Sequence, residues 1–187
     1  MTLPVNGHAV NKSLLHPALT ARVSCTQDMA RALVEMELRP GYITRWLRMR
    51  ESEVRKIWHQ VHHRPPSRGK MPESINFAYI QGEKCIQASL FTASWIRLRR
   101  VSDEATAFIR SWTIYQKEFG RQCIIDANRA WLLARNAQDG YIHFATCPTC
   151  AHRLIYDPFG NAWRWTCSVC KTVHEPRRLR IVSSKSL

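Results

Sequence analysis

The sequence lacks the long apolar runs, the acidic residues and the glycine-rich loops on which several classes of protein depend. No apolar run approaches the ~18 residues that a membrane-spanning helix needs, and Met1 to Leu19 has no hydrophobic block after a basic start. Only 14 of the 187 residues are acidic, no paired carboxylates share a helical face with a histidine, and there is no Walker-type glycine loop. We therefore expect the chain to be cytoplasmic and to have no membrane segment. We also expect that it is not an enzyme.

The scarcity of acidic residues leaves the chain strongly basic. Lys and Arg number 28, so the formal net charge is +14, and most of these residues are arginine. A guanidinium group fits phosphate oxygens and guanine edges better than an ammonium group does. Because 45% of the residues are apolar, the chain can still bury a packed core. The composition favours a folded protein with a polyanionic partner, of which nucleic acid is the first to consider.

Four of the seven cysteines have the spacing of a metal site. Cys147 and Cys150 form one C-x-x-C pair, and Cys167 and Cys170 form a second pair after sixteen intervening residues. An odd number of cysteines without a secretory signal argues against a disulfide scaffold, whereas this spacing is typical of a tetrathiolate Zn²⁺ site. Four thiolates fill a tetrahedron and leave no open position, so the sequence predicts one structural Zn²⁺ per chain.

The residues around these cysteines predict a zinc ribbon at 141–175. Two β-prone runs, 154–156 and 163–165, flank a turn signal at 157–161 and are expected to form a hairpin. Three histidines lie nearby and are either exposed, able to replace a cysteine, or able to bond to a sulfur: His143, His152 and His174. The three isolated cysteines are expected to be buried thiols without chemistry: Cys25, Cys85 and Cys123.

The rest of the chain predicts a mostly α-helical domain at 28–140, between an N-terminal arm (1–27) and the ribbon. Apolar residues recur at helical spacing in 28–38, 42–47, 54–61, 85–98, 104–119 and 123–137. Ser102 is expected to start a helix and Gly140 to end the last one. The large aromatic residues of 85–137 are expected to form the core, with any uncovered face available to a partner subunit. The basic tail, 176–187, is expected to be frayed.

The segment 42–62 has the pattern of a helix-turn-helix. Its apolar residues fall where the two helices and the turn between them need them: Ile43, Leu47, Met49, Val54 and Trp58. Arg48 occupies a turn position that often holds glycine, where a left-handed backbone is easiest. The alternative interpretation is an ordinary helical hairpin with a solvated basic face.

Basic residues concentrate around this segment. Nine basic and two acidic residues lie between Arg39 and Lys70, which is half of the net charge. The predicted DNA contacts lie in the helix-turn-helix, the Pro/Gly-containing linker (64–72) and the tail: Arg48, Arg50, Arg55, Lys56, Arg64, Arg68, Lys70, Arg177 and Arg178. An alternative hypothesis is an RNA-binding zinc ribbon, in which Trp163 and Trp165 share a face and stack on unpaired bases.

Several segments together resemble the FlhC family, a subunit of the bacterial flagellar master transcription activator. They are the basic helical region, 65–72 (PPSRGKMP), 86–91 (IQASLF), 129–131 (RAW) and the four-cysteine ribbon, and the likeness covers about 28–175. The resemblance implies a mostly helical DNA-binding subunit with a structural Zn²⁺ on the four cysteines. It also implies assembly with the FlhD protein, as four FlhD and two FlhC, and activation of flagellar promoters by recruitment of RNA polymerase. The chain departs from the family in a longer arm, a shorter tail and a shorter helix-turn-helix region.

Overall fold

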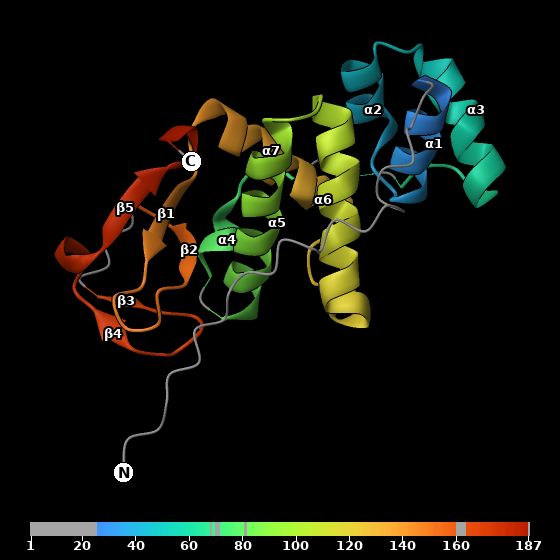
Figure 1. Cartoon of the computed structure of the whole chain (residues 1–187). Helices are drawn as coiled ribbons and strands as arrows, with labels where there is room; N and C mark the ends of the chain where they lie inside the picture. Colours follow the sequence, from blue (N-terminus) through green and yellow to red (C-terminus); the bar gives the residue numbers. More distant parts are fainter. Residues whose placement is uncertain (1–25, 68, 70–71, 81, 160–163, 187) are drawn as a thin grey trace.

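The computed structural model describes residues 26–67, 69, 72–80, 82–159 and 164–186. The α-helices are α1 (Thr26–Glu35), α2 (Pro40–Leu47), α3 (Glu51–His62), α4 (Asn76–Tyr79), α5 (Glu83–Arg99), α6 (Glu104–Phe119) and α7 (Ala127–Asp139). The strands are β1 (His143–Thr146), β2 (Arg153–Tyr156), β3 (Trp165–Thr166), β4 (Val173–His174) and β5 (Arg180–Ser183), with 3₁₀-helices η2 (Gly120–Gln122), η3 (Pro176–Arg178) and η4 (Ser184–Ser186). The strands occupy one end of the molecule and α1–α3 the other (Figure 1). The predicted fold class, mostly helical with a C-terminal four-cysteine region, is confirmed.

None of the described helices is both long enough and apolar enough to cross a membrane. The longest, α5, has 17 residues and contains Lys84, Arg97 and Arg99 among its apolar positions.

Aspartate side chains fix where the later helices begin. The Asp103 carboxylate accepts the backbone N–H of Thr106 at 3.0 Å and starts α6, and Asp126 accepts the N–H of Asn128 at 2.9 Å and starts α7. Ser102 does not cap α6, because its hydroxyl donates to the carbonyl of Leu98 instead. The predicted bounds of α6, 104–119, are confirmed, but its cap is one residue later than Ser102, and α7 begins later than the predicted 123.

The aromatic residues of α5, α6 and α7 form the main core. The Phe91 ring lies edge-on to its neighbours Phe108 and Tyr115, with ring centroids 5.6 and 6.3 Å apart. Six large aromatic side chains of these helices are at most 5% exposed: Phe91, Trp95, Phe108, Trp112, Tyr115 and Trp131. Among the described residues, the chain itself therefore covers the aromatic face that was considered available to a partner.

A buried glutamine connects α5 to the segment before α7. Gln87 Oε1 accepts the hydroxyl of Tyr115 and the backbone N–H of Ile124, the latter at 2.9 Å. The Tyr115 hydroxyl oxygen in turn accepts the N–H of Ile125 at 2.9 Å, and burial raises the pKa of Tyr115 to about 12. These bonds satisfy the irregular backbone around residue 124 and so fix the starting point of α7.

The β-region consists of two antiparallel hairpins, and each hairpin turn carries one C-x-x-C pair. β1 pairs with β2 around the first pair, and β3 pairs with β4 around the second. The predicted hairpin between 154–156 and 163–165 is therefore wrong for the described residues. The physical reason is that each C-x-x-C turn reverses the chain, so that the strands on its two sides pair with each other.

The end of the chain completes the larger sheet, whose strand order is β2-β1-β5. β5 is antiparallel to β1, with Val182 opposite Phe144. The Ser184 hydroxyl donates to the carbonyl of Ala137 at 2.7 Å, and its N–H donates to the carbonyl of Ile142 at 2.8 Å. The expectation of a frayed tail is therefore wrong, because backbone pairing and these bonds fix residues 180–184.

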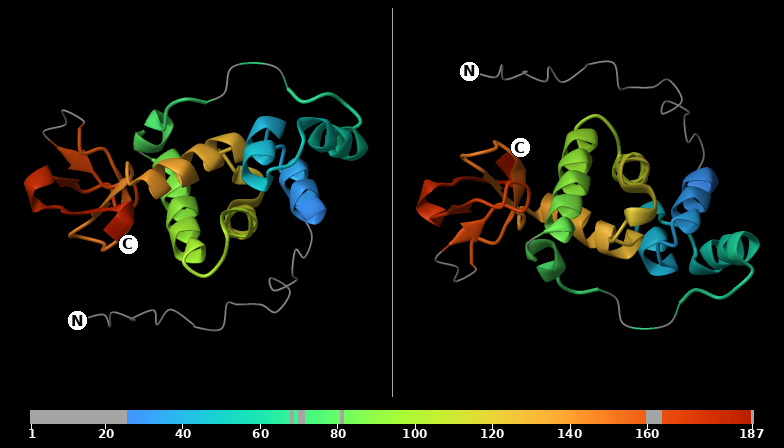
Figure 2. Two further views of the ribbon diagram at one scale, coloured as in Figure 1. Left: turned by 90° about the horizontal axis from the view of Figure 1, so that it is seen from above. Right: turned by 90° about the horizontal axis from the view of Figure 1, so that it is seen from below.

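Helix α7 leads directly into this sheet. Its first turn lies beside α2 and its end adjoins β1, so it runs from the α1–α3 end of the molecule to the strands (Figure 2). The helix ends at Gly140, as predicted, in a left-handed conformation with φ of 83°. A Cβ at this position would lie 2.7 Å from Lys185 Cε and would displace that flexible side chain, so it is the left-handed backbone that favours glycine here.

The N-terminal half of α5 packs against the ribbon. The Ser89 hydroxyl accepts the N–H of Ile155 at 2.8 Å, and Cys85 Sγ lies 3.6 Å from the Ile155 carbonyl oxygen. Burial raises the pKa of the Cys85 thiol. Cys85 is thus the buried thiol that was predicted, Cys123 is only half-buried, and Cys25 lies outside the described residues.

Candidate metal centre and nucleic-acid interface

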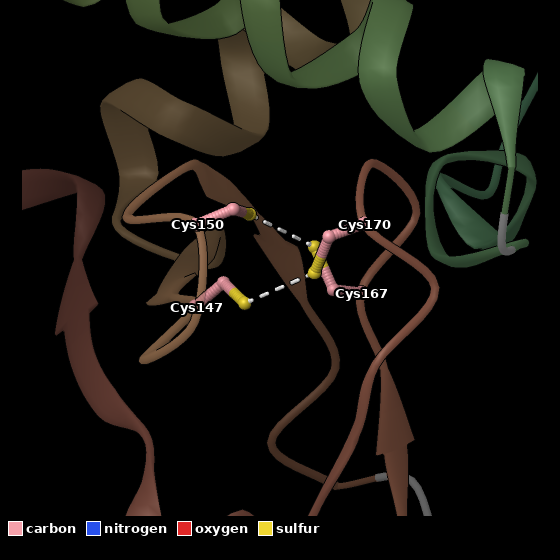
Figure 3. Close-up of side chains that lie close together, drawn as sticks. All are labelled: Cys147, Cys150, Cys167 and Cys170. Carbon is pink, nitrogen blue, oxygen red and sulfur yellow. Dashed lines mark hydrogen bonds between the residues drawn. The ribbon is translucent and has the colours of Figure 1, made fainter. Parts of the chain in front are cut away.

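The four cysteine sulfurs of the ribbon converge on one point (Figure 3). Cys147 Sγ lies 3.7 Å from Cys170 Sγ, Cys150 Sγ lies 3.7 Å from Cys167 Sγ, and all four atoms lie within 4.8 Å of one another. A Zn–S bond of about 2.3 Å places the sulfurs of a tetrahedral site about 3.8 Å apart. The four cysteines are therefore positioned to bind one metal ion, and their spacing fits a metal of this size.

The two C-x-x-C turns have the same backbone structure. In the first, the Cys147 N–H donates to the carbonyl of His152 and the Cys147 carbonyl accepts the N–H of Ala151, both at 2.9 Å. The second turn repeats both bonds, with the same distances, twenty positions later. Ala151 and Lys171 occupy equivalent positions and both are left-handed, with φ of 59° and 62°. This repeated geometry directs the two thiols of each turn to the same side.

Two of the sulfurs have polar neighbours outside the cluster. Cys170 Sγ lies 3.4 Å from the Thr172 hydroxyl, and hydrogen bonds from the side chain and then the backbone of Thr172 lower the pKa of Cys170 to about 6. Cys147 Sγ lies 3.3 Å from His174 Nε2. The site therefore includes groups that stabilise thiolate charge. Sequence analysis considered His174 but missed Thr172, whose role depends on the turn geometry.

The other sequence-predicted groups near the cysteines do not contact a sulfur. His152 Nδ1 lies 3.1 Å from the Cys150 carbonyl oxygen, and the His143 ring lies near Phe159. Trp165 is only 8% exposed and packs against the His174 ring at 5.9 Å. The RNA hypothesis required an exposed face on this tryptophan, and its partner Trp163 lies outside the described residues.

At the opposite end of the molecule, α2 and α3 are joined by a three-residue turn, Arg48 to Arg50. Arg48 has φ of 52° and ψ of 33°, so it adopts the left-handed conformation that the turn requires. The apolar residues predicted for this segment pack into the core, with three buried (Ile43, Val54 and Trp58) and two partly buried (Leu47 and Met49). The segment therefore consists of two helices joined by a short turn, with its apolar residues packed inward and arginine where glycine is common.

The predicted DNA-contacting residues of this segment differ in their partners. Arg48, Arg50 and Lys56 are exposed and form no ion pair within the described residues. The Arg55 guanidinium instead lies 2.7 Å from the Glu51 carboxylate, one helical turn away on α3. The acidic first turn of α3 therefore offsets part of the basic charge of this helix.

Most of the remaining predicted contacts are paired or lie outside the described residues. Arg64 is ion-paired with Glu37, and Arg177 and Arg178 share the Glu175 carboxylate at 2.7 and 3.6 Å. Arg68 and Lys70 lie outside the described residues. The structure thus places the predicted basic residues in two regions, at α2–α3 with the start of the linker and beside the ribbon.

Residues 19–182 match the family described as Flagellar transcriptional activator (FlhC). The chain belongs to the FlhC family. The matched range contains α1 to α7, all four cysteines and most of β5. This family consists of transcriptional regulators and is not a class of enzymes.

Two curated relatives of the FlhC family are similar to the chain at low identity. Flagellar transcriptional regulator FlhC of Cupriavidus pinatubonensis (strain JMP 134 / LMG 1197) is 22% identical over 156 residues, which are 81% of this chain and 74% of the relative. The protein of the same name from Gallionella capsiferriformans (strain ES-2) is 23% identical over 137 residues, which are 70% of this chain and 73% of the relative. The chain is thus similar to regulators of flagellar transcription over most of its length.

Proposed function

We propose that the chain binds double-stranded DNA as a subunit of a transcription activator at flagellar and related promoters. The observation that carries the proposal is the three-residue turn between α2 and α3 with a left-handed Arg48, which fits a helix-turn-helix. The net charge of +14 provides the attraction to phosphate that DNA binding needs. Membership of a family of flagellar transcriptional activators supports the same function.

The proposed contacts divide by their position in the fold. The N-terminal part of a recognition helix enters the major groove, so Arg50 and Lys56 of the α3 region read bases, with Arg48 and Arg55 beside them. The linker and tail residues contact phosphates: Arg64, Arg68, Lys70, Arg177 and Arg178. Arg55 contributes least to the first group, because DNA would have to compete with Glu51 for its guanidinium.

The metal is one Zn²⁺ per chain, held by Cys147, Cys150, Cys167 and Cys170 in a structural role. Tetrathiolate coordination leaves no position for a reacting water, so the ion supplies rigidity and not catalysis. Elemental analysis of the purified protein should give one zinc per chain. A folded ribbon in a protein without any metal would contradict this assignment.

The partners are an FlhD-like protein and RNA polymerase, as the family membership suggests. An assembly of four FlhD-like and two FlhC-like chains should appear by light scattering when the two proteins are mixed. If the isolated chain stays a stable monomer and does not bind the FlhD-like protein, the activator acts without this partner.

Selection of bound duplexes from a random pool, with and without the FlhD-like protein, tests the DNA proposal. Replacement of Arg50 and Lys56 by alanine should change the preferred sequence and cost roughly 1 to 3 kcal/mol at the affected base pair. Replacement of Lys117 and Arg121 by alanine is the matched control, because both are exposed, at the end of α6 and on η2, and together they remove the same charge elsewhere. Unchanged affinity and preference after the double replacement, or tighter binding of single-stranded RNA than of duplex at equal salt, would contradict the proposal.

A further inference from the structure

A cleft between α2 and α7 brings two arginines of the predicted helix-turn-helix region next to an arginine of α7. Its volume is about 360 Å³, and its lining includes Arg45 and Arg48 from α2 and the turn, and Arg135 from α7. Trp46 and Trp131 form the aromatic part of the lining. All three arginines are exposed, so their guanidinium groups are accessible to a ligand from solvent.

Contacts between α2 and α7 hold these arginines in place. The Arg39 N–H at the start of α2 donates to Asn128 Oδ1 of α7 at 3.0 Å. One turn further on, the rings of Tyr42 and Trp131 stack with centroids 3.7 Å apart, and the Arg135 guanidinium lies 5.5 Å from the centroid of the Trp131 ring. The start of α7 therefore packs against α2, and the cleft lies at the C-terminal end of α2.

Trp131 lies in the wall of the cleft and is only 4% exposed, and its indole N–H is itself buried. The three guanidinium groups are therefore the donors that the cleft offers to an anion, and each presents several N–H groups.

Two carboxylates also line the cleft, and their partners decide its charge. Glu104 Oε1 accepts the Gln138 amide at 2.7 Å and lies 3.5 Å from the Arg99 guanidinium, so its charge is already compensated. Asp139 lies 3.9 Å from Arg135 in a half-exposed pair, which is a weak interaction. Arg45 and Arg48 have no carboxylate partner among the described residues.

We propose that this cleft binds a backbone phosphate of the DNA through Arg45, Arg48 and Arg135. The first helix of a helix-turn-helix crosses the sugar–phosphate backbone, and α2 is that helix here. Arg135 adds a third guanidinium group, from α7, to those of Arg45 and Arg48. A phosphate competes with Asp139 for the Arg135 guanidinium. This inference rests on the proposed DNA-binding function and adds a contact from an element outside the helix-turn-helix.

The slope of log affinity against log salt concentration measures such a contact. The metal-loaded full chain and its variants are titrated into a fluorescein-labelled duplex of mixed sequence at several salt concentrations. The Arg45→Ala/Arg135→Ala double variant should reduce the slope by up to about 0.9, so that a fourfold rise in salt weakens binding up to about 3.5-fold less than in the unmodified chain, and each single variant should reduce the slope by a smaller amount. Arg121→Ala, which removes the same charge as a single variant but from η2, should leave the slope unchanged.

A gain in affinity separates this proposal from a loss of folding. Asp139→Asn removes the carboxylate that competes for Arg135, so it should tighten duplex binding several-fold without changing the preferred sequence. Inorganic phosphate at constant ionic strength should displace duplex from the unmodified chain more than from the Arg45/Arg135 double variant. Phosphate that binds the cleft without competing with duplex would show a site for the free ion and overturn the inference.

The possible failures are distinguishable. If the unmodified chain binds no duplex, the proposed function fails, and this inference fails with it. If the chain binds duplex but the double variant has the salt slope of Arg121→Ala, or Asp139→Asn does not tighten binding, only the cleft proposal is overturned. Equal midpoints of thermal unfolding for the variants show that the changes in slope come from binding.

Discussion

Ala151 and Lys171 adopt the left-handed conformation in the two metal-binding turns, although neither is glycine. This conformation costs a residue with a side chain about 1–2 kcal/mol, which exceeds the entropic cost of introducing glycine. Ala151→Gly should therefore raise the free energy of unfolding of the metal-loaded protein by about 0.5–1 kcal/mol. Denaturant titration measures this free energy of unfolding. Ala93→Gly, at an exposed helical position on α5, is the control and should lower the same free energy by about 1 kcal/mol.

The thiols predict how metal affinity depends on pH. Metal binding needs thiolates and releases a proton from each thiol that is still protonated. The pKa of Cys170 is lowered to about 6 by Thr172, whereas burial raises the pKa of Cys150 and Cys167. Above about pH 6, Cys170 is already ionised, so binding should release at most three of the four protons, and apparent affinity should still rise with pH.

Competition with a chromophoric chelator over a range of pH tests this proton count. Thr172→Ala removes the hydroxyl beside Cys170, so proton release near neutral pH should move towards four. Release of four protons by the unmodified protein would show that Cys170 is an ordinary thiol.

At the scale of single residues, the sequence identified the metal ligands but not their neighbours. The spacing of the four cysteines is local information, because each C-x-x-C turn brings its own pair together. The contact of Thr172 with Cys170 depends on the geometry of its turn, and the contact of His174 with Cys147 depends on how the two hairpins meet, which no spacing rule specifies. The cleft between α2 and α7 was missed for the same reason, since Arg45 and Arg135 are distant in sequence.

At the scale of elements, the start of α6 provides a test between sequence and structure. The structure assigns the cap to Asp103, which accepts the Thr106 N–H, and not to Ser102. Asp103→Ala should cost about 1 kcal/mol of stability, and Ser102→Ala should cost less. Thermal or denaturant unfolding of both variants gives the comparison, and the reverse order would return the cap to Ser102.

Helices could be predicted from the sequence better than strand partners. Apolar residues at helical spacing identified α1, α2, α3, α5 and α6 because that signal lies within each helix. The pairing of β5 with β1 joins residues nearly forty positions apart, and the short β3 and β4 carry little pattern of their own. The tail therefore looked frayed in the sequence although it completes a sheet.

At the scale of the whole molecule, the packing of the ribbon on α5 couples the metal to a distant thiol. Chelation should unfold the ribbon and leave the helical part largely intact, because the main core lies among the helices. Cys85, buried at 4% exposure between α5 and the ribbon, should then become reactive towards iodoacetamide. Mass spectrometry locates the modified residues. Cys123 lies outside the ribbon and serves as the control, since its reactivity should not change with metal.

If Cys85 stays protected after complete metal removal, the ribbon keeps its contact with α5 and the metal is not needed for that contact. Cys147→Ser should reproduce the effect of chelation, because it removes one of the four ligands.

Helix α7 connects the α2 end of the molecule to the sheet over a fixed length. Its thirteen residues, at a rise of 1.5 Å each, span about 20 Å between the contact with α2 and the first strand of the sheet. Its buried residues pack against α5, and its C-terminal end at Gly140 is held against the sheet. Measured along a DNA duplex, this span corresponds to about six base pairs at 3.4 Å each. The distance between the two ends of α7 is therefore fixed by the protein. A duplex that contacts both ends of the molecule must bend or twist to match this distance.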